Sequence, residues 1–171
     1  DEFFEIRVAG LKQQVKYGST QTGPDNLSPT EVLTRVSETA HQFVEEQYSV
    51  WNDLIIPAMA KDNIRLLRRS QWKSQTSRWI HRYFKDEVLP VLSPIGLDPA
   101  HPFPKVQNKN LYFIISLDGK DAFGRDSGLA IVQAPRSLPR VIPVKTKYSD
   151  GNHDFVMLSS IIHAHVSDLF P

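Results

Sequence analysis

Basic side chains are concentrated in one short part of the chain, residues 61–85. This stretch holds eight lysines and arginines against Asp62 alone, whereas residues 1–60 hold four basic and nine acidic residues, and the net charge of the whole chain is only +1. Because guanidinium groups bind phosphate oxygens through paired hydrogen bonds, such a segment could bind a polyanion. The candidate polyanion contacts are Arg65, Arg68, Arg69 and Lys73, which Arg78, Arg82 and Lys85 continue on the next expected helix.

Two interpretations of this basic segment stay open. It could be a polyanion-binding surface on helices within residues 61–85, or a solvated face that packs on the acidic N-terminal helices. Trp72 and Trp79 could stack on a base, but their spacing also suits the buried side of a helix. Nucleic acid is the less favoured partner, because exposed aromatic residues do not alternate with the basic ones.

Two histidines, His163 and His165, are the candidates for metal binding. On a strand, residues two apart share a face, but we expect these two on a helix, where they diverge by about 200°. Asp168, the possible acidic ligand, lies at a helical spacing that suits His165 but does not bring it close to both imidazoles. The sequence therefore predicts no metal site, and the expected role of the segment is a capping or partner-facing helix.

Other catalytic constellations are not evident in the sequence. The chain contains no cysteine, which excludes disulfides, thiolate metal sites and cysteine nucleophiles. Gly119 and Lys120 are followed by Asp121, where a phosphate-binding loop needs Ser or Thr, so we expect a hairpin connection there. Motifs alone predict no catalytic residue in this span.

The first 60 residues read as helical. Apolar residues at helical spacing predict a helix over residues 1–17. A second, long helix is expected to start at Ser28, because Ser28 can cap it, proline follows, and Glu31 can complete a capping box. Pro57 should end or kink this helix. The two helices are expected to form an antiparallel pair.

The rest of the chain mixes helices and strands. We expect a helix from a Ser70 cap to Leu89, an ordered extended segment in the proline-rich run Ser93–Pro104, and a last helix capped by Ser159 or Ser160. The connections between strands are too short for crossover helices, so the strands should pair mainly antiparallel. The strand candidates are Leu111–Leu117, Gly128–Ala134, Val141–Lys145 and Phe155–Leu158.

The predicted fold class is therefore α+β: an antiparallel helical unit, then a small mixed domain with a mainly antiparallel sheet and flanking helices. We place the boundary between residues 1–62 and 63–171. The chain begins at Asp1 with a helical pattern already under way, so we expect both the start of the first domain and the end of the second to be incomplete.

Several ordered segments together resemble the bacterial long-chain polyphosphate kinases. The match extends over nearly the whole chain and is weakest at residues 18–27 and 145–152. The segments that carry the resemblance are Asp1–Lys12, Ser93–Pro104, Asp121–Gly128, Ala134–Arg140, Leu158–His165 and Asp168–Pro171.

The resemblance implies a role within a larger enzyme. Members of this family transfer the terminal phosphoryl group of ATP to polyphosphate reversibly, through a phosphohistidine and with Mg²⁺, in catalytic domains that follow the span matched here. This span would thus be a non-catalytic N-terminal and head portion that supports nucleotide-pocket formation and dimerisation, with no cofactor of its own. Asp1, Phe4 and Arg7 would border the adenine pocket.

The resemblance also implies partners and a location. The intact enzyme would bind ATP and polyphosphate, assemble as a homo-oligomer through the head domain, and work in the cytoplasm, with peripheral association with the inner membrane left open. No run of 18 apolar residues predicts a membrane-spanning segment. The alternative function is a stand-alone polyanion- or protein-binding module that acts through basic helices in residues 61–85.

Overall fold

The computed structural model describes residues 2–19, 21–98, 102–119, 128–149 and 152–170. The chain divides into two compact units, Asp1–Ala58 and Met59–Pro171, and each is described by itself. Sequence reasoning placed the domain boundary after residue 62, and that position stays a prediction.

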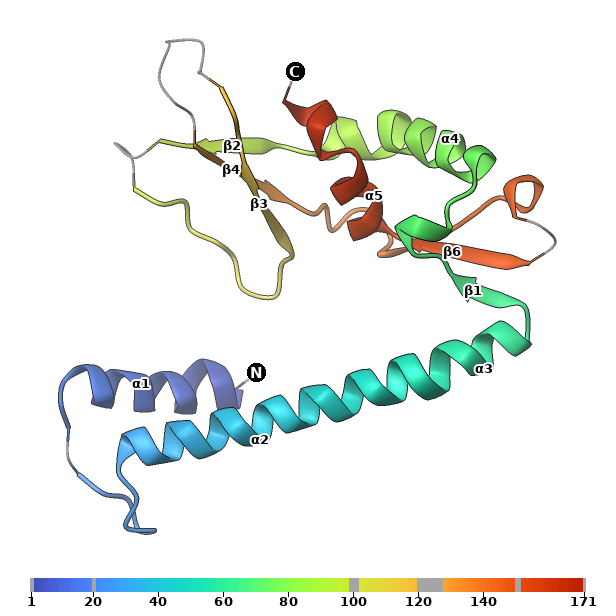
Figure 1. Ribbon diagram of the computed structural model, residues 1–171. Coiled ribbons are helices and arrows are strands. Elements are labelled where there is room, and N and C mark those ends of the chain that lie inside the picture. Colours follow the sequence, from blue (N-terminus) through green and yellow to red (C-terminus); the bar gives the residue numbers. More distant parts are fainter. Residues whose placement is uncertain (1, 20, 99–101, 120–127, 150–151, 171) are drawn as a thin grey trace. The chain divides into compact units, whose positions relative to one another are not determined.

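The first unit is a helical pair. A π-helical turn, Phe3–Val8, leads into α1 (Ala9–Lys16), and a loop connects it to α2 (Pro29–Ser49). Figure 1 shows α1 beside the first part of α2 and running in the opposite direction, as predicted. The predicted capping box is confirmed: the backbone N–H of Glu31 donates to Ser28 Oγ, and the Ser28 N–H donates to the Glu31 carboxylate at 2.8 Å.

The long helix does not end at Pro57, contrary to one of the two predicted outcomes there. A π-helical segment, Val50–Ile55, follows α2 and leads into α3 (Ile56–Lys61), in which Pro57 is the second residue. The Ile56 N–H bonds to the Trp51 carbonyl, five residues earlier. This change in hydrogen-bonding pattern accommodates a residue without an N–H, since π turns interrupt the regular ladder.

The second unit contains two small sheets with helices packed on them. Along the chain, β1 (Ile64–Leu66), α4 (Ser74–Tyr83) and a π-helical extension (Phe84–Val88) precede most of the strands. The strands that follow are β2 (Pro94–Leu97), β3 (Tyr112–Ser116), β4 (Leu129–Gln133), β5 (Val141–Pro143) and β6 (His153–Met157), and then α5 (Leu158–Ala164). Single 3₁₀ turns lie at Arg69–Gln71, Leu89–Val91, Thr146–Tyr148 and Val166–Leu169.

One sheet has the strand order β2-β4-β3 and the other β1-β6-β5. Three of the four pairings are antiparallel, which confirms the predicted tendency. The exception is β1, which pairs parallel to β6. Four of the strands, β3 to β6, coincide with the sequence candidates to within two residues at each end. Strand β2 lies in the proline-rich run, where an extended segment was expected.

The core of the second unit lies between α4, α5 and the inner faces of the strands. Trp79 belongs to it, with its ring 5.7 Å from that of Tyr83 and stacked on Tyr148 at 6.1 Å. The largest side chains that are fully buried are Phe84, Ile80, Ile161, Ile162, Val88, Val132 and Val156. The α+β class with helices flanking mainly antiparallel strands is thus confirmed.

Two predicted helix caps are wrong. Ser70 lies inside the 3₁₀ turn, and α4 begins four residues later with Lys73 in the N-cap position. The last helix starts at Leu158 with Met157 as N-cap, so Ser159 is already helical. Neither observed N-cap residue makes a side-chain capping bond. Both helices are fixed by their buried apolar side chains rather than by a capping side chain.

Candidate functional site

The basic segment does not form the continuous helical surface that its spacing suggested. It starts at the end of α3, passes through β1 and the 3₁₀ turn Arg69–Gln71, and becomes helical again only from Ser74. The description of residues 61–85 as basic helices is therefore wrong for Arg65, Arg68 and Arg69. The error arose because positions three, four and eight apart look helical in sequence, whereas a short strand and a turn occupy them.

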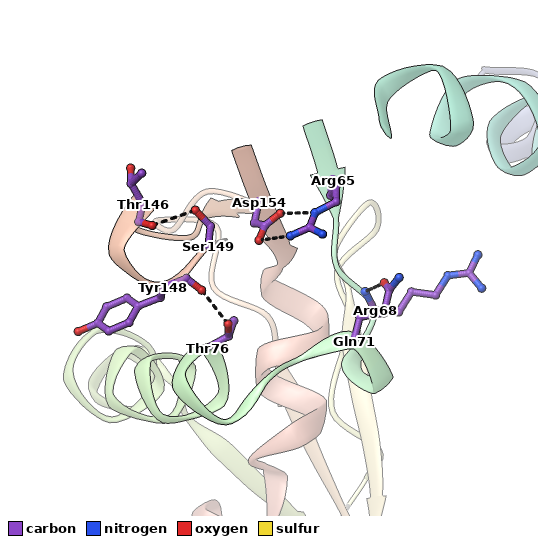
Figure 2. Close-up of polar contacts among 8 residues, drawn as sticks. All are labelled: Arg65, Arg68, Gln71, Thr76, Thr146, Tyr148, Ser149 and Asp154. Atoms are coloured by element: carbon purple, nitrogen blue, oxygen red, sulfur yellow. Dashed lines mark hydrogen bonds and ion pairs between the residues drawn. The ribbon is translucent and has the colours of Figure 1, made fainter. Parts of the chain in front are cut away.

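Arg65 forms a structural ion pair with Asp154. Its Nε and Nη2 donate to the two carboxylate oxygens of Asp154 at 2.7 and 2.8 Å. The Asp154 side chain is 3% exposed and that of Arg65 38%. Figure 2 shows the two side chains meeting between β1 and β6. A guanidinium held by two bonds to a buried carboxylate is poorly placed to bind an external polyanion.

The other three predicted polyanion contacts lie close to the start of α4. The Arg68 backbone N–H donates to Gln71 Oε1 at 2.8 Å, which closes the 3₁₀ turn, as Figure 2 shows. Arg69 follows within the turn and Lys73 is the N-cap of α4, and all three side chains are exposed. Cationic groups at a helix start oppose the helix dipole.

A second group of basic residues, the predicted continuation of the segment, lies along α4 and its π-helical extension. Arg78, Arg82 and Lys85 are exposed and stand about one turn apart, and they line one surface pocket together with His81 and His165. We call Arg78, Arg82 and Lys85 the α4 basic stripe. Trp79 is 8% exposed and belongs to the core, although it also lines a surface pocket with Arg78 and Arg82, so little of its ring is open to stacking.

The pocket also brings together residues that the sequence kept apart. His81 Nδ1 lies 3.5 Å from His165 Nδ1 and 3.8 Å from Asp168 Oδ2. His163 is exposed within α5, whereas His165 is half-buried at its C-cap, and the predicted divergence of the two imidazoles stays a prediction. Sequence reasoning missed His81 because it lies 84 residues from His165. The spacing of His165 and Asp168 was the one local signal.

The surroundings of His165 disfavour the charged form of its imidazole. Burial lowers the pKa of its imidazole, the charges of His81, Arg69 and Lys85 act in the same direction, and Asp168 opposes them. The ring packs 5.0 Å from those of both His81 and Phe84. Its Nε2 is buried without a hydrogen-bond partner.

The residues expected at an adenine pocket lie in the first unit. Asp1 falls outside the described residues. Phe4 and Arg7 lie on the π-helical turn, where Phe4 is 56% exposed and its ring contacts that of Phe3 edge to face at 5.1 Å. Arg7 makes an exposed ion pair of 3.4 Å with Glu2. An exposed ring beside a weakly held guanidinium is suited to border a base, and this role stays a prediction.

The predicted hairpin around the glycines is consistent with the strands on either side of it. β3 and β4 pair antiparallel, and the Leu117 N–H donates to the Gly128 carbonyl at 3.2 Å. Residues 120–127, which include the Lys120 and Asp121 that argued against a phosphate loop, lie outside the described residues.

The β2-β4-β3 sheet presents an apolar outer face. Ile95 and Ile114 are both in register with Ile131, and Leu129 lies two residues from it on the same face. The exposed fractions are 51% for Ile95, 67% for Ile114 and 44% for Leu129. The opposite face carries Val132, which is fully buried in the core. Exposed apolar side chains gathered on one face are typical of an interaction surface.

The helices contain no segment suited to crossing a membrane: within the described residues, none is both long enough and apolar enough.

Two family models match the chain. "Polyphosphate kinase N-terminal domain" matches residues 1–67 and "Polyphosphate kinase middle domain" matches residues 75–171. Curated proteins named polyphosphate kinase are similar over nearly the whole chain: 54% identity over 170 residues for the one from Pseudomonas putida and 51% over 171 residues for the one from Pseudomonas aeruginosa. These matches include 99% and 100% of this chain, but only 23% and 25% of the length of the two relatives.

A solved structure shows the same fold. The crystal structure of polyphosphate kinase from Porphyromonas gingivalis superposes with a TM-score of 0.79 at 23% sequence identity. The match covers 99% of this chain and 24% of that one. The present chain therefore spans about a quarter of the length of the proteins that it matches.

Proposed function

The chain belongs to the polyphosphate kinase family, and we propose that it serves as the N-terminal and middle-domain portion of such an enzyme. In this proposal the intact protein transfers phosphoryl groups between ATP and polyphosphate with Mg²⁺, through a phosphohistidine, and works in the cytoplasm. The observation that carries the proposal is the pair of consecutive domain matches, which together account for residues 1–67 and 75–171.

Within the intact enzyme, this span is proposed to support catalysis rather than to perform it. Phe4 and Arg7 on the first helical turn would border the adenine base, with Asp1 beside them, and ATP and Mg²⁺ would be held mainly by residues beyond this span. Phosphoryl transfer depends on positioning and charge neutralisation, so a domain that walls the nucleotide site can affect the rate without supplying a reacting group.

Assembly is the second part of the proposal. The apolar outer face of the β2-β4-β3 sheet, with Ile95, Ile114 and Leu129 exposed, supports a homo-oligomer contact through the middle domain. The helical unit also exposes apolar side chains, among them Phe43, Tyr48 and Leu54 of the long helix. These are suited to pack against the remaining domains of the intact enzyme.

A chimera tests this function. The corresponding N-terminal quarter of the Pseudomonas aeruginosa relative is replaced by this chain, and ATP-dependent polyphosphate synthesis is measured with Mg²⁺. We expect activity from the chimera and none from the 171-residue chain alone. Robust synthesis by the chain alone would contradict the supporting role, and a folded but inactive chimera would contradict the proposed place in the enzyme.

The alternative function is a polyanion-binding module. The α4 basic stripe favours it, since Arg78, Arg82 and Lys85 are exposed on one pocket. Arg65, in contrast, is bonded to Asp154, so a test by charge reversal of Arg65 would report on folding instead of binding. Charge reversal of the stripe is the discriminating experiment.

A further inference from the structure

His81, His165 and Asp168 form the one group of potential metal ligands found within the described residues. His81 comes from α4, His165 caps α5 and Asp168 lies in the 3₁₀ turn that follows. One ligand atom from each residue lies within 4.8 Å of the other two. The three elements meet in the second unit, so the group is a product of tertiary folding.

The distances inside this group suit an ion better than direct hydrogen bonds. The separations of 3.5 Å between the two Nδ1 atoms and 3.8 Å between His81 Nδ1 and Asp168 Oδ2 exceed the usual 2.7–3.2 Å of N–H···O bonds. Two ligands bound at about 2.0–2.1 Å to a tetrahedral zinc ion are about 3.3–3.4 Å apart. The two His81 separations are thus close to those of bound ligands, and all three ligand atoms lie within 4.8 Å of one another, so side-chain adjustment would bring them around one ion.

The packing around His165 prepares it as a ligand. Its ring is fixed against Phe84 and against His81, each at 5.0 Å between centroids, which leaves little freedom to lose on binding. Two imidazoles and one carboxylate are a ligand set of catalytic zinc sites, which retain an open position.

The charge around the group sets its limits. Asp168 contributes the one negative ligand, while Lys85 and Arg69 place positive charge near His165. Arg78 and Arg82 line the same pocket, where Asp86 adds one negative charge. The positive side chains weaken the binding of a dication, so the bound ion must have a strong affinity for imidazole. This excludes Mg²⁺ and Ca²⁺, which prefer oxygen ligands, and favours zinc and its neighbours in the first transition row.

We propose that His81, His165 and Asp168 form a binding site for one divalent transition-metal ion of the zinc type on the surface of the middle domain. The proposed site does not depend on the proposed function. The ion would join α4 to the turn after α5, and its open position would face the pocket lined by the α4 basic stripe.

The test uses the full 171-residue chain, freed of metal with a chelator. Zn²⁺ binding is measured by calorimetry, Co²⁺ binding by its visible absorption, and unfolding temperature with and without Zn²⁺. We expect one ion per chain and a rise in unfolding temperature, since an ion that binds the folded state stabilises it. Removal of an outer partner of a metal ligand already costs about 10–100-fold in affinity, so His81→Ala and His165→Ala should each lose at least that much.

Two further variants make the test specific. Asp168→Asn should weaken binding and change the Co²⁺ spectrum, because the carboxylate ligand is replaced by a neutral amide. His163→Ala is the matched control, since His163 is exposed on the same helix α5 and outside the group. Because His81 is on the surface, His81→Ala should fold normally. Unchanged Zn²⁺ affinity in His81→Ala, or equal loss in His163→Ala, would overturn the proposal.

Discussion

Arg65 and Asp154 stand opposite one another on the parallel strands β1 and β6 and share two hydrogen bonds, of 2.7 and 2.8 Å. The pair joins positions 89 residues apart in the sequence. It therefore connects the start of the second unit to its last strand. Asp154 is buried and needs a cation beside it, so the first arginine of the basic segment has a structural role.

Removal of Arg65 should destabilise the second unit strongly. Arg65→Ala leaves the Asp154 carboxylate buried without its partner, which costs about 3–5 kcal/mol for a buried pair. We expect the lower end of this range, because the Arg65 side chain is 38% exposed and water can reach part of the site. Denaturant unfolding measures the loss. The control Arg78→Ala, at an exposed position, should change stability by less than about 0.5 kcal/mol. Equal stability of the two variants would refute the structural role.

Charge reversal of the α4 basic stripe tests polyanion binding without touching Arg65. The triple variant Arg78→Glu, Arg82→Glu, Lys85→Glu should weaken the binding of polyphosphate and RNA at low salt, because it removes contacts between cations and phosphates. Each lost contact should also lower the salt dependence of the affinity. Fluorescence anisotropy over a salt series measures both effects. A matched control makes the same charge change at other exposed residues of the unit: Lys105→Glu, Arg136→Glu, Arg140→Glu. If both variants lose binding equally, net charge rather than the stripe is responsible.

Local sequence signals predicted much of this fold. The Ser28 capping box and the buried side of α4 are set by residues within a few positions of each other, and both were predicted from the sequence. In contrast, β1 is only three residues long with Arg65 at its centre, too short to show an alternating pattern, and it pairs with a strand far along the chain. Its pairing could be known only from the folded structure.

The candidate site, too, could be predicted only where local sequence signals define it. The sequence located the basic segment but not the distribution of its side chains, because no local pattern indicated that Arg65 is bonded to the buried Asp154. The approach of His81 to His165 depends on how α4 packs against the end of α5. Such relationships arise from the core, and periodicity along the chain does not contain them.

The capping box at the start of α2 should give a measurable dependence on pH. The hydrogen bond from the Ser28 side chain, with that of the Ser28 backbone and the charge of Arg35, lowers the pKa of Glu31. Ionised Glu31 therefore stabilises the helix at pH values above its ordinary pKa, and this contribution is lost as the pH falls through the lowered pKa. Ser28→Ala should raise the pKa of Glu31 and lower the unfolding temperature near pH 7, and this temperature difference should shrink in acid.

NMR titration of the Glu31 carboxyl checks the first effect, and thermal unfolding at two pH values checks the second. Thr34→Ala is a suitable control, because the Thr34 hydroxyl bonds to the Thr30 carbonyl in the same helix and does not contact Glu31. A pKa of Glu31 that is the same in Ser28→Ala and in the unmodified chain would show that the box does not hold the carboxylate.

The apolar face of the β2-β4-β3 sheet predicts an effect on assembly. Ile114→Glu places a charge on the face proposed as an oligomer contact, where its burial would carry a large desolvation cost. In the chimera with the Pseudomonas aeruginosa relative, sedimentation should show a shift from oligomer to monomer. Val141→Glu, at a position 45% exposed on the other sheet, should leave the oligomer intact. An Ile114→Glu oligomer of unchanged stability would exclude this face.

The contact between α4 and the Thr146–Tyr148 turn gives a last prediction about stability. The Thr76 hydroxyl donates to the Tyr148 carbonyl at 3.0 Å, and Thr76 is 4% exposed, as Figure 2 shows for the contact itself. Thr76→Val keeps the shape of the side chain but leaves the partly buried Tyr148 carbonyl without this donor, which costs about 1 kcal/mol. Thr146→Val makes the same chemical change at an exposed position and should be nearly neutral. Denaturant unfolding of both variants measures this loss. Because the bond holds Tyr148 in place against Trp79, the tryptophan fluorescence should change in Thr76→Val alone. Equal free energies of unfolding in the two variants would show that packing, not this bond, fixes the turn.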